Sequence, residues 1–584
     1  MKLHFARIIL AGLLLGAAPL LAAPADDLKS VIGDHWAWSL SVDPFLATQV
    51  GDKSGDGKLP DPSLAEADRQ AATAQTFIDR LDRIDDKALS PEDAINRDVL
   101  RRMLKDRVDG NRFGQRAMTF TTYSGWHTGF AGYPESAKLE TKADYDAYLG
   151  RLAAYPAYNK AQIAVTRTGL AGGYAQPCEP LKGFDKSIST HVVARPEDSV
   201  FWAPFAAKRP AIITETDWTA LQTRARALIT TGVVPAYAEL LAFYTAEYAP
   251  KCRQTVGIGA TPGGTDYYAY RAREMTTTDL TPEAIHEIGL SEVARINAAM
   301  DRVAADAGFP DRKAYVAHLR SDPKYYAKTP QELLEKTAWV TKQIDDWMPK
   351  IIGKLPRLPF SVKPIPADQA EGTTTAYSEW GSVANGRAGV YRVNTTHLDQ
   401  RPLYELPALS LHEAAPGHQT QGSLQQELAV PDFRRHLASF TAFVEGWALY
   451  AESLGDEMGL YDTPEKKMGR YSYEMWRATR LVVDTGMHVK GWSRDKAIQY
   501  MMANTALSQH NVEAEINRYI TWPGQALAYK IGELRIKQLR AKAETALGNR
   551  FDERRFHDTL LENGPVPLDV LEAHVDRWIA RQKA

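Results

Sequence analysis

The amino-acid sequence predicts a mainly α fold, a large helical body with a deep cleft and a small β-sheet or hairpin. Helix-start signals recur, because a Ser or Thr is followed by Pro and then by Glu or Gln at residues 90–92, 281–283, 329–331 and 463–465. Ser or Thr at the cap and Pro at the first helical position favour a helix start. Apolar residues also recur at a spacing of three to four over residues 64–84, 218–248 and 284–303. Strand signals are sparse.

Residues 1–25 have the layout of a secretory signal peptide. Two basic residues precede an apolar run over residues 8–23, and cleavage after Ala23 or Ala25 fits the small residues there. The alternative is an uncleaved anchor, but the run is shorter than the roughly 20 residues that a span needs. No cysteine stands nearby for a lipid anchor, and no later stretch reads as long and apolar enough for a bilayer. We therefore expect the mature chain, residues 26–584, to be periplasmic or secreted, with no stable membrane span.

The mature chain is several times longer than a usual domain of about 150 residues, so its core can be large. We expect one helical unit with two lobes around one cleft and a boundary near residues 266–281, where loop character gives way to long helices. The net charge of −2 argues against a nucleic-acid partner and gives no bulk attraction to an acidic membrane. The sequence carries no sign of the oligomeric state.

Cys178 and Cys252 are the two cysteines of the chain. A site with four cysteine ligands is therefore excluded. In an oxidising compartment, an even pair that stands away from any metal motif predicts one disulfide. The alternative is two unpaired thiols.

One region favours β structure. Residues 373–380 and 388–396 are rich in β-branched and aromatic side chains, with Gly381 and Asn385-Gly386 between them, which predicts a small hairpin or sheet. It would either line the cleft as an edge strand that pairs with a substrate backbone, or pack on the core as a structural sheet. Residues 356–366 contain four prolines and read as a connector.

The stretch His412-Glu413-Ala-Ala-Pro-Gly-His418 holds the residues of a candidate metal site. Two imidazoles can share a zinc ion, and a neighbouring carboxylate can act as a base. Histidines six residues apart lie about 120° apart around a regular helix, so one ion needs a reshaped helix between them. Pro416 and Gly417 offer a reason for such a break. The spacing alone does not bring both histidines to one ion.

A second stretch, Phe443 to Glu452, reads as a buried helix. Glu445 and Glu452 are seven residues apart on the same face, and buried carboxylates are costly unless something compensates them. A metal ion would do so. Either glutamate could supply the third ligand, and Glu445 is preferred.

These two stretches resemble the bacterial DUF885 family, which is placed among gluzincin-like metallopeptidases. The resemblance continues in residues 518–532 and 276–283 and covers most of the mature chain. It implies a mostly helical fold and a zinc-type active site, and it leaves the substrate open.

The following roles are expected if the site is formed. His412, His418 and Glu445 would be the ligands, with an open position for water, and Glu413 would be the general base. Glu452 would orient an imidazole from behind. Candidate donors to the oxyanion are Tyr519, Tyr529 and His488. Asp484 would orient His488 on a shared helix face, although Arg480 and Asp484 also fit an exposed salt-bridged face.

The leading functional hypothesis is an exported zinc-dependent peptidase that acts on a peptide substrate. Other divalent metals also suit two histidines and a carboxylate. The alternatives are a catalytically inactive peptide- or ligand-binding protein of the same fold and a zinc hydrolase of another amide or ester. Serine catalysis is disfavoured because no Gly-x-Ser-x-Gly elbow is found, and neither cysteine shows an activated setting.

Overall fold

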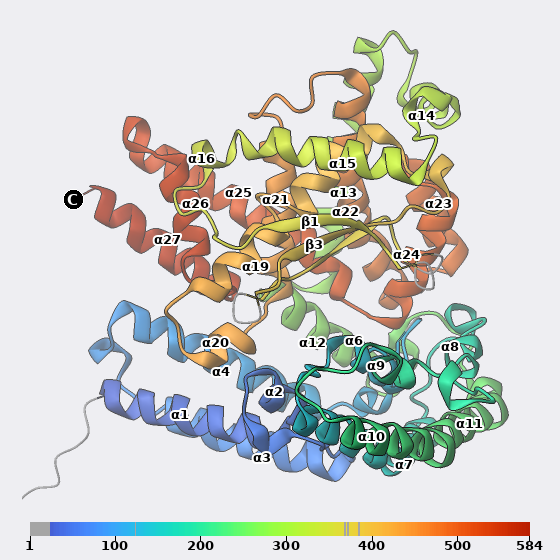
Figure 1. The fold of residues 1–584 in the computed structure, drawn as a ribbon. Coiled ribbons are helices and arrows are strands. Elements are labelled where there is room, and N and C mark those ends of the chain that lie inside the picture. Colours follow the sequence, from blue (N-terminus) through green and yellow to red (C-terminus); the bar gives the residue numbers. More distant parts are fainter. Residues whose placement is uncertain (1–23, 123, 367–369, 371–372, 383–385, 584) are drawn as a thin grey trace, which may run out of the picture.

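The structure is a computed structural model that describes residues 24–122, 124–366, 370, 373–382 and 386–583. The predicted mainly α fold is confirmed, with one small sheet among many helices (Figure 1). Most of the predicted signal peptide, residues 1–23, lies outside the described residues, as does Asn385.

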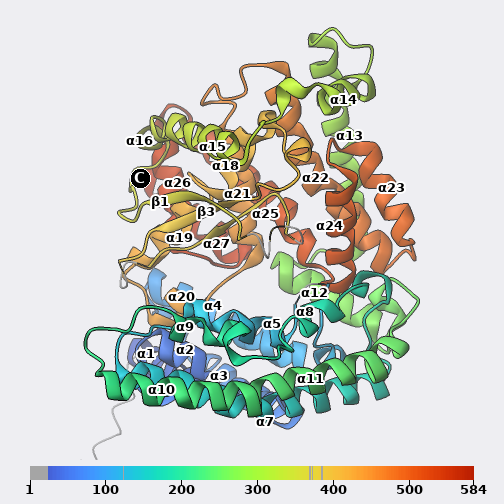
Figure 2. The ribbon, with the colours of Figure 1, turned by 45° about the vertical axis from the view of Figure 1, so that its right-hand side comes forward.

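One layer of the molecule is built from residues 24–248, about the first two fifths of the chain (Figures 1 and 2). Its long helices are α1 (Pro24–Val42), α3 (Leu64–Leu81), α4 (Pro91–Asn111), α7 (Lys142–Ala171), α10 (Glu215–Leu228) and α11 (Val234–Phe243). The second half of this segment has its own hydrophobic core, which runs from Phe120 to Tyr248. We call this part, residues 120–248, the small lobe.

The other layer carries the larger hydrophobic core. Its long helices are α13 (Pro282–Asp306), α15 (Pro330–Asp345), α21 (Thr441–Leu454), α22 (Pro464–His488), α25 (Ala528–Leu547) and α27 (Leu568–Lys583). Helices α1, α3 and α4 also contribute to this core, so the N-terminal helices bind the two layers together. The shorter helices are α2 (Pro44–Gln49), α5 (Trp126–Ala131), α6 (Tyr133–Ser136), α8 (Asp185–Ser189), α9 (Ala203–Ala206), α12 (Gly264–Thr276), α14 (Arg312–Ser321), α16 (Met348–Ile351), α18 (Leu406–Glu413), α19 (His418–Glu427), α20 (Asp432–His436), α23 (Arg494–Asn504), α24 (Gln509–Thr521) and α26 (Glu553–Leu561).

The predicted helix starts are present. The side chains of Ser90, Thr281 and Thr329 each accept a hydrogen bond from the backbone N–H three residues on, which satisfies a donor that the helix leaves free. Thr463 precedes α22 as expected, without such a bond.

The sheet contains three strands, β1 (Phe360–Pro364), β2 (Ala376–Glu379) and β3 (Gly389–Val393), in the order β1-β3-β2. Strand β3 pairs parallel with β1 and antiparallel with β2. Strand β1 corrects the reading of residues 356–366 as a connector. Pro364 is tolerated there because an edge strand pairs on one side only.

A helical run over Glu215–Lys251 is, within the described residues, long and apolar enough by composition to cross a membrane. This corrects the expectation that no stretch after the N-terminus passes that test. Core helices of soluble proteins pass it too. Here the buried side chains of the run, such as Leu221 and Leu240, belong to the core of the small lobe together with α7.

The predicted disulfide is confirmed, because Cys178 and Cys252 are joined with a sulfur–sulfur distance of 2.03 Å. The backbone N–H of Cys178 also donates to the carbonyl of Arg253 at 3.0 Å. Near the predicted lobe boundary, α12 ends and α13 begins, with Thr277 between them at a φ of 51°. The division into lobes there stays a prediction.

Candidate metal centre

A break between two helices brings the histidines together. Helix α18 ends at Glu413 and α19 begins at His418. The intervening Ala414 and Gly417 have ψ values of −101° and −132°, far from helical geometry. A Cβ on Gly417 would stand 1.9 Å from the carbonyl oxygen of His412, so this position requires glycine. The reshaping expected around Pro416 and Gly417 is therefore present.

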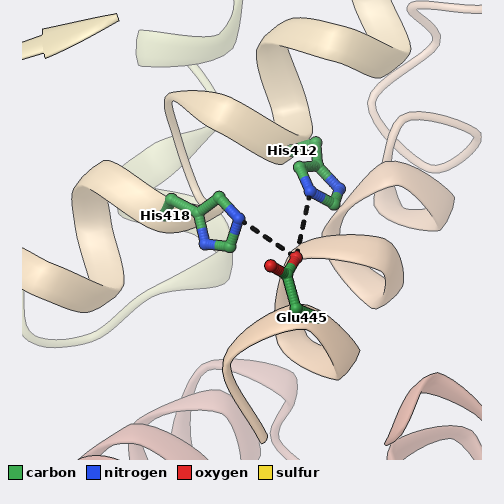
Figure 3. A group of neighbouring side chains, drawn as sticks. All are labelled: His412, His418 and Glu445. Carbon is green, nitrogen blue, oxygen red and sulfur yellow. Dashed lines mark ion pairs between the residues drawn. The ribbon is translucent and has the colours of Figure 1, made fainter. Parts of the chain in front are cut away.

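The two imidazoles point at one carboxylate from α21 (Figure 3). Nε2 of His412 lies 3.5 Å from Oε2 of Glu445, and Nε2 of His418 lies 3.3 Å from the same oxygen. The ring centroids of the histidines are 4.8 Å apart. One donor atom from each of the three residues lies within 4.8 Å of the other two. Helices α18, α19 and α21 thus bring these three side chains to one point.

This donor set fits a zinc ion. Ligand atoms that share a tetrahedral zinc at about 2.0–2.2 Å lie roughly 3.3 Å from one another, close to the two contacts with Glu445. Oε2 of Glu445 and Nδ1 of His418 are buried without a hydrogen-bond partner among the described atoms. Two nitrogens and one carboxylate oxygen are ligands that zinc accepts, and other divalent ions also accept them.

Glu452 supports His412 from the far side of its ring. Oε1 of Glu452 lies 2.8 Å from Nδ1 of His412 and 3.0 Å from Nη2 of Arg477. This hydrogen bond leaves Nε2 of His412 for the centre. Glu445 thus lies beside both histidines and Glu452 contacts only His412, while their roles as ligand and supporting residue stay predictions.

The charges of the centre attract a cation. Burial lowers the pKa of His412, but the nearby carboxylates of Glu445 and Glu452 outweigh it and raise the pKa to about 9. Burial raises the pKa of Glu445, but His418 and His412 together hold it well below its usual range. An ionised carboxylate beside two imidazole nitrogens is an arrangement that favours a bound cation.

Glu413 is held by the sheet rather than by the histidines. The hydroxyl of Ser378 in β2 donates to Oε2 of Glu413 at 2.8 Å and also lies 2.5 Å from its backbone oxygen. Glu413 is buried and lines the same cavity as the three donor residues. Its carboxylate is therefore positioned beside the centre. Ser378 lies within a predicted strand, but nothing in its local sequence pointed to Glu413.

The centre opens into a cavity of about 2150 Å³ between the two layers. One wall comes from residues 122–210, mostly in the small lobe, and the other from residues 373–529. The expected cleft is therefore present. Side chains that line it include Glu179, His191, Ser378, Trp380, Glu413, Trp476, Arg477, Arg480, Trp522 and Tyr529.

Of the three oxyanion candidates, Tyr529 lines the cavity. Burial raises the pKa of Tyr529, and the nearby Glu445 carboxylate raises it further. The hydroxyl of Tyr519 is occupied by the indole N–H of Trp476 at 3.1 Å and by Nε of Arg480 at 2.7 Å. Tyr529 is thus the candidate that can reach a substrate.

His488 and Asp484 have structural partners, which corrects the prediction that they act as a pair. Nδ1 of His488 accepts from the backbone N–H of Ile258 at 3.0 Å, and its Nε2 lies 3.1 Å from the carbonyl of Tyr519. Burial lowers the pKa of His488 to about 3. Asp484 accepts from Tyr268 at 2.5 Å and from the backbone of Gly524 at 3.1 Å.

Two arginines of α22 were not assigned to the site from sequence. Arg477 contacts Glu452, and Arg480 lines the cavity. Both are 3% exposed, so the reading of Arg480 as part of an exposed salt-bridged face is wrong. The sequence signal for their burial was their position among the apolar residues of this helix.

The fold and the site define a mainly helical protein with a centre of two histidines and one glutamate at the base of a large cavity. The family described as "Bacterial protein of unknown function (DUF885)" matches residues 44–575. The chain therefore belongs to the DUF885 family.

Solved structures show the same fold over nearly the whole chain. A "putative lipoprotein" from Colwellia psychrerythraea is 27% identical, with a TM-score of 0.88, and the match covers 96% of this chain and 100% of that one. A "putative lipoprotein of unknown function" from Shewanella oneidensis is 20% identical, with a TM-score of 0.70, over 95% and 99% of the two chains. No curated protein matches the chain significantly.

Proposed function

We propose that this protein is a zinc-dependent hydrolase that cleaves peptide bonds. The observation that carries the proposal is the convergence of His412 and His418 on Glu445, with Glu413 beside them in the same cavity. Three protein ligands leave a position for water, as in catalytic rather than structural zinc sites. This is the arrangement expected of a gluzincin-like enzyme.

The side chains divide the chemistry among them. Zinc, when bound, would polarise the scissile carbonyl and make water easier to deprotonate. Glu413 takes the proton of the attacking water and passes it to the leaving amine, while Ser378 holds its carboxylate in place. Glu452 keeps the His412 ring oriented. Tyr529 donates to the oxyanion from the cavity wall.

Strand β2 supports a peptide as the substrate. It is an edge strand, because it pairs with β3 on one side in the order β1-β3-β2. Residues 373–378 line the cavity. An extended peptide can add to such an edge through backbone hydrogen bonds.

Export forms part of the proposal. The layout of residues 1–25 favours secretion, and the disulfide between Cys178 and Cys252 suits an oxidising compartment. The similar structure from Colwellia psychrerythraea is described as a "putative lipoprotein", a description that agrees with export.

Metal analysis and a peptide screen test this function together. We expect about one zinc per chain in the purified protein, and cleavage of a mixed peptide library that a chelator stops and added zinc restores. Zinc without peptide cleavage would point to another amide or ester, which a substrate screen would identify. Neither metal nor cleavage would overturn the proposal in favour of a binding protein of the same fold.

A further inference from the structure

We propose that Arg480 binds a carboxylate group of the substrate on the cavity wall beside the metal centre. The inference rests on the proposed function, because it assigns a substrate feature to the same cavity. The carboxylate belongs either to the C-terminus of the peptide or to an acidic side chain near the cleaved bond.

The guanidinium of Arg480 is fixed in place but incompletely paired. Its Nε donates to the hydroxyl of Tyr519 at 2.7 Å, and its Nη2 pairs with Glu515 at 3.0 Å. Its Nη1 is buried and has no hydrogen-bond partner among the described atoms. The side chain is 3% exposed and lines the cavity. A charged donor without an acceptor is costly in such a place, so a ligand that supplies the acceptor would be favoured.

Two aromatic rings hold the plane of this guanidinium. The Cζ atom of Arg480 lies 4.6 Å from the ring centroid of Trp476 and 4.2 Å from that of Tyr529. Cation–π contacts with two rings restrict the guanidinium before a ligand arrives. Arg480, Tyr529 and the donor residues of the centre line the same cavity.

The partner carboxylate of Arg480 is shared with a second arginine. Glu515 is the shared partner of Arg480 and Arg518, at 3.0 and 2.9 Å. Two guanidinium groups therefore share one carboxylate. A carboxylate from the substrate would give each guanidinium group a carboxylate of its own. The two parallel N–H groups of an arginine match the two oxygens of a carboxylate.

The choice among anions follows from the reaction. A peptide supplies carboxylates at its C-terminus and on Asp and Glu, and either would meet Arg480 when the scissile bond lies at the centre. Because Arg480 and the centre line the same cavity, one bound peptide can contact both.

Three labelled peptides test the inference by binding alone. All three are N-terminally labelled pentapeptides. Two have the same sequence and end in a free carboxylate or in an amide. The third is the amide with Glu in place of the last residue. The protein is zinc-loaded Glu413→Gln, which should bind peptide without cleaving it, and fluorescence anisotropy gives the Kd. We expect the acid or the Glu amide to bind about 10- to 100-fold more tightly than the plain amide, the range for hydrogen bonds to charged groups. Whichever of the two is favoured identifies the source of the carboxylate.

Two further substitutions in the Glu413→Gln protein assign the effect to Arg480. Arg480→Gln should abolish the preference. The matched control is Arg494→Gln. Arg494 lines the same cavity and its Nε is bonded to Asn517 at 2.8 Å, but unlike Arg480 it has no nitrogen that is buried without a hydrogen-bond partner among the described atoms. That variant loses the same charge and should keep the preference. If Arg480→Gln does not fold, Arg480→Lys keeps the charge, lacks the fork and should weaken the preference.

Equal binding of all three peptides, no binding of any, or a preference that survives Arg480→Gln would overturn the inference. The proposed function fails separately, if the unmodified zinc-loaded protein cleaves none of the peptides or the library while the acid preference persists. Cleavage without any acid preference would leave the hydrolase standing and remove only the role of Arg480.

Discussion

Glu413 hydrogen bonds to Ser378 and stands beside the donor residues without being one of them. Glu413→Gln keeps the shape of the side chain and removes its basicity. If Glu413 is the general base, peptide hydrolysis should fall by about 10²- to 10⁴-fold. The zinc content should stay near that of the unaltered protein, because His412, His418 and Glu445 are untouched. Steady-state kinetics and metal analysis on the same sample measure both quantities.

His418→Ala is the matched comparison at the residue scale. It removes a donor atom from the centre, so both zinc and activity should be lost. The assignment of base and ligand would be reversed if Glu413→Gln lost the metal and His418→Ala retained it. Full activity in Glu413→Gln would remove the proposed mechanism.

At the scale of elements, the crossing of α21 and α25 positions the centre. Helix α21 carries Glu445 and Glu452, and it meets α25 at two glycines. A Cβ on Gly446 would lie 2.6 Å from the backbone of Gly532, and a Cβ on Gly532 would lie 1.9 Å from the carbonyl oxygen of Ala442. Both glycines are therefore required for the close approach of the helices.

Gly532→Ala should push α21 away from its position. Overpacking of this kind costs about 1–3 kcal/mol in the free energy of unfolding, and zinc affinity should fall because Glu445 moves with the helix. Chemical denaturation and zinc titration measure the two effects.

Gly33→Ala is the control for Gly532→Ala. Gly33 lies in α1, where an added Cβ would meet nothing within 4 Å. That substitution should raise stability by about 0.4–1 kcal/mol through the unfolded chain. Similar destabilisation by both substitutions would show that steric contact at the crossing is not the cause.

At the scale of the whole molecule, the disulfide closes a loop over much of the small lobe, whose residues form one wall of the cavity. Cys178 and Cys252 are 74 residues apart. On the entropic model a loop of this length contributes about 4 kcal/mol of stability. Reduction should therefore lower the melting temperature, and a Cys178→Ser, Cys252→Ser double variant should melt at the same lowered temperature without reductant.

The double variant is also the control for other effects of the reductant. Because it has no bridge, adding reductant should leave its melting temperature unchanged. Two thiols per chain in the unreduced, unfolded protein would contradict the bridge. An unchanged melting temperature on full reduction would show that the loop contributes no stability.

The sequence by itself determined the features that depend on local chain chemistry. Capping residues such as Ser90 mark helix starts because they satisfy backbone donors within one turn. Pro416 and Gly417 predict the helix break because both residues disfavour a regular helix. The metal centre stays a prediction from residue type, because a buried carboxylate such as Glu445 is costly without a compensating charge.

Only the tertiary structure decided which surface each side chain meets. Helical spacing places Asp484 and His488 on one face, but two partners of that face, Ile258 and Tyr268, lie more than 200 residues away in the chain. Arg480 read as exposed because its partner Glu515 comes from another helix. The hydrogen bond from Ser378 to Glu413 depends on how the sheet packs against α18. Contacts between distant segments are set by packing of whole elements, which no local pattern of residues encodes.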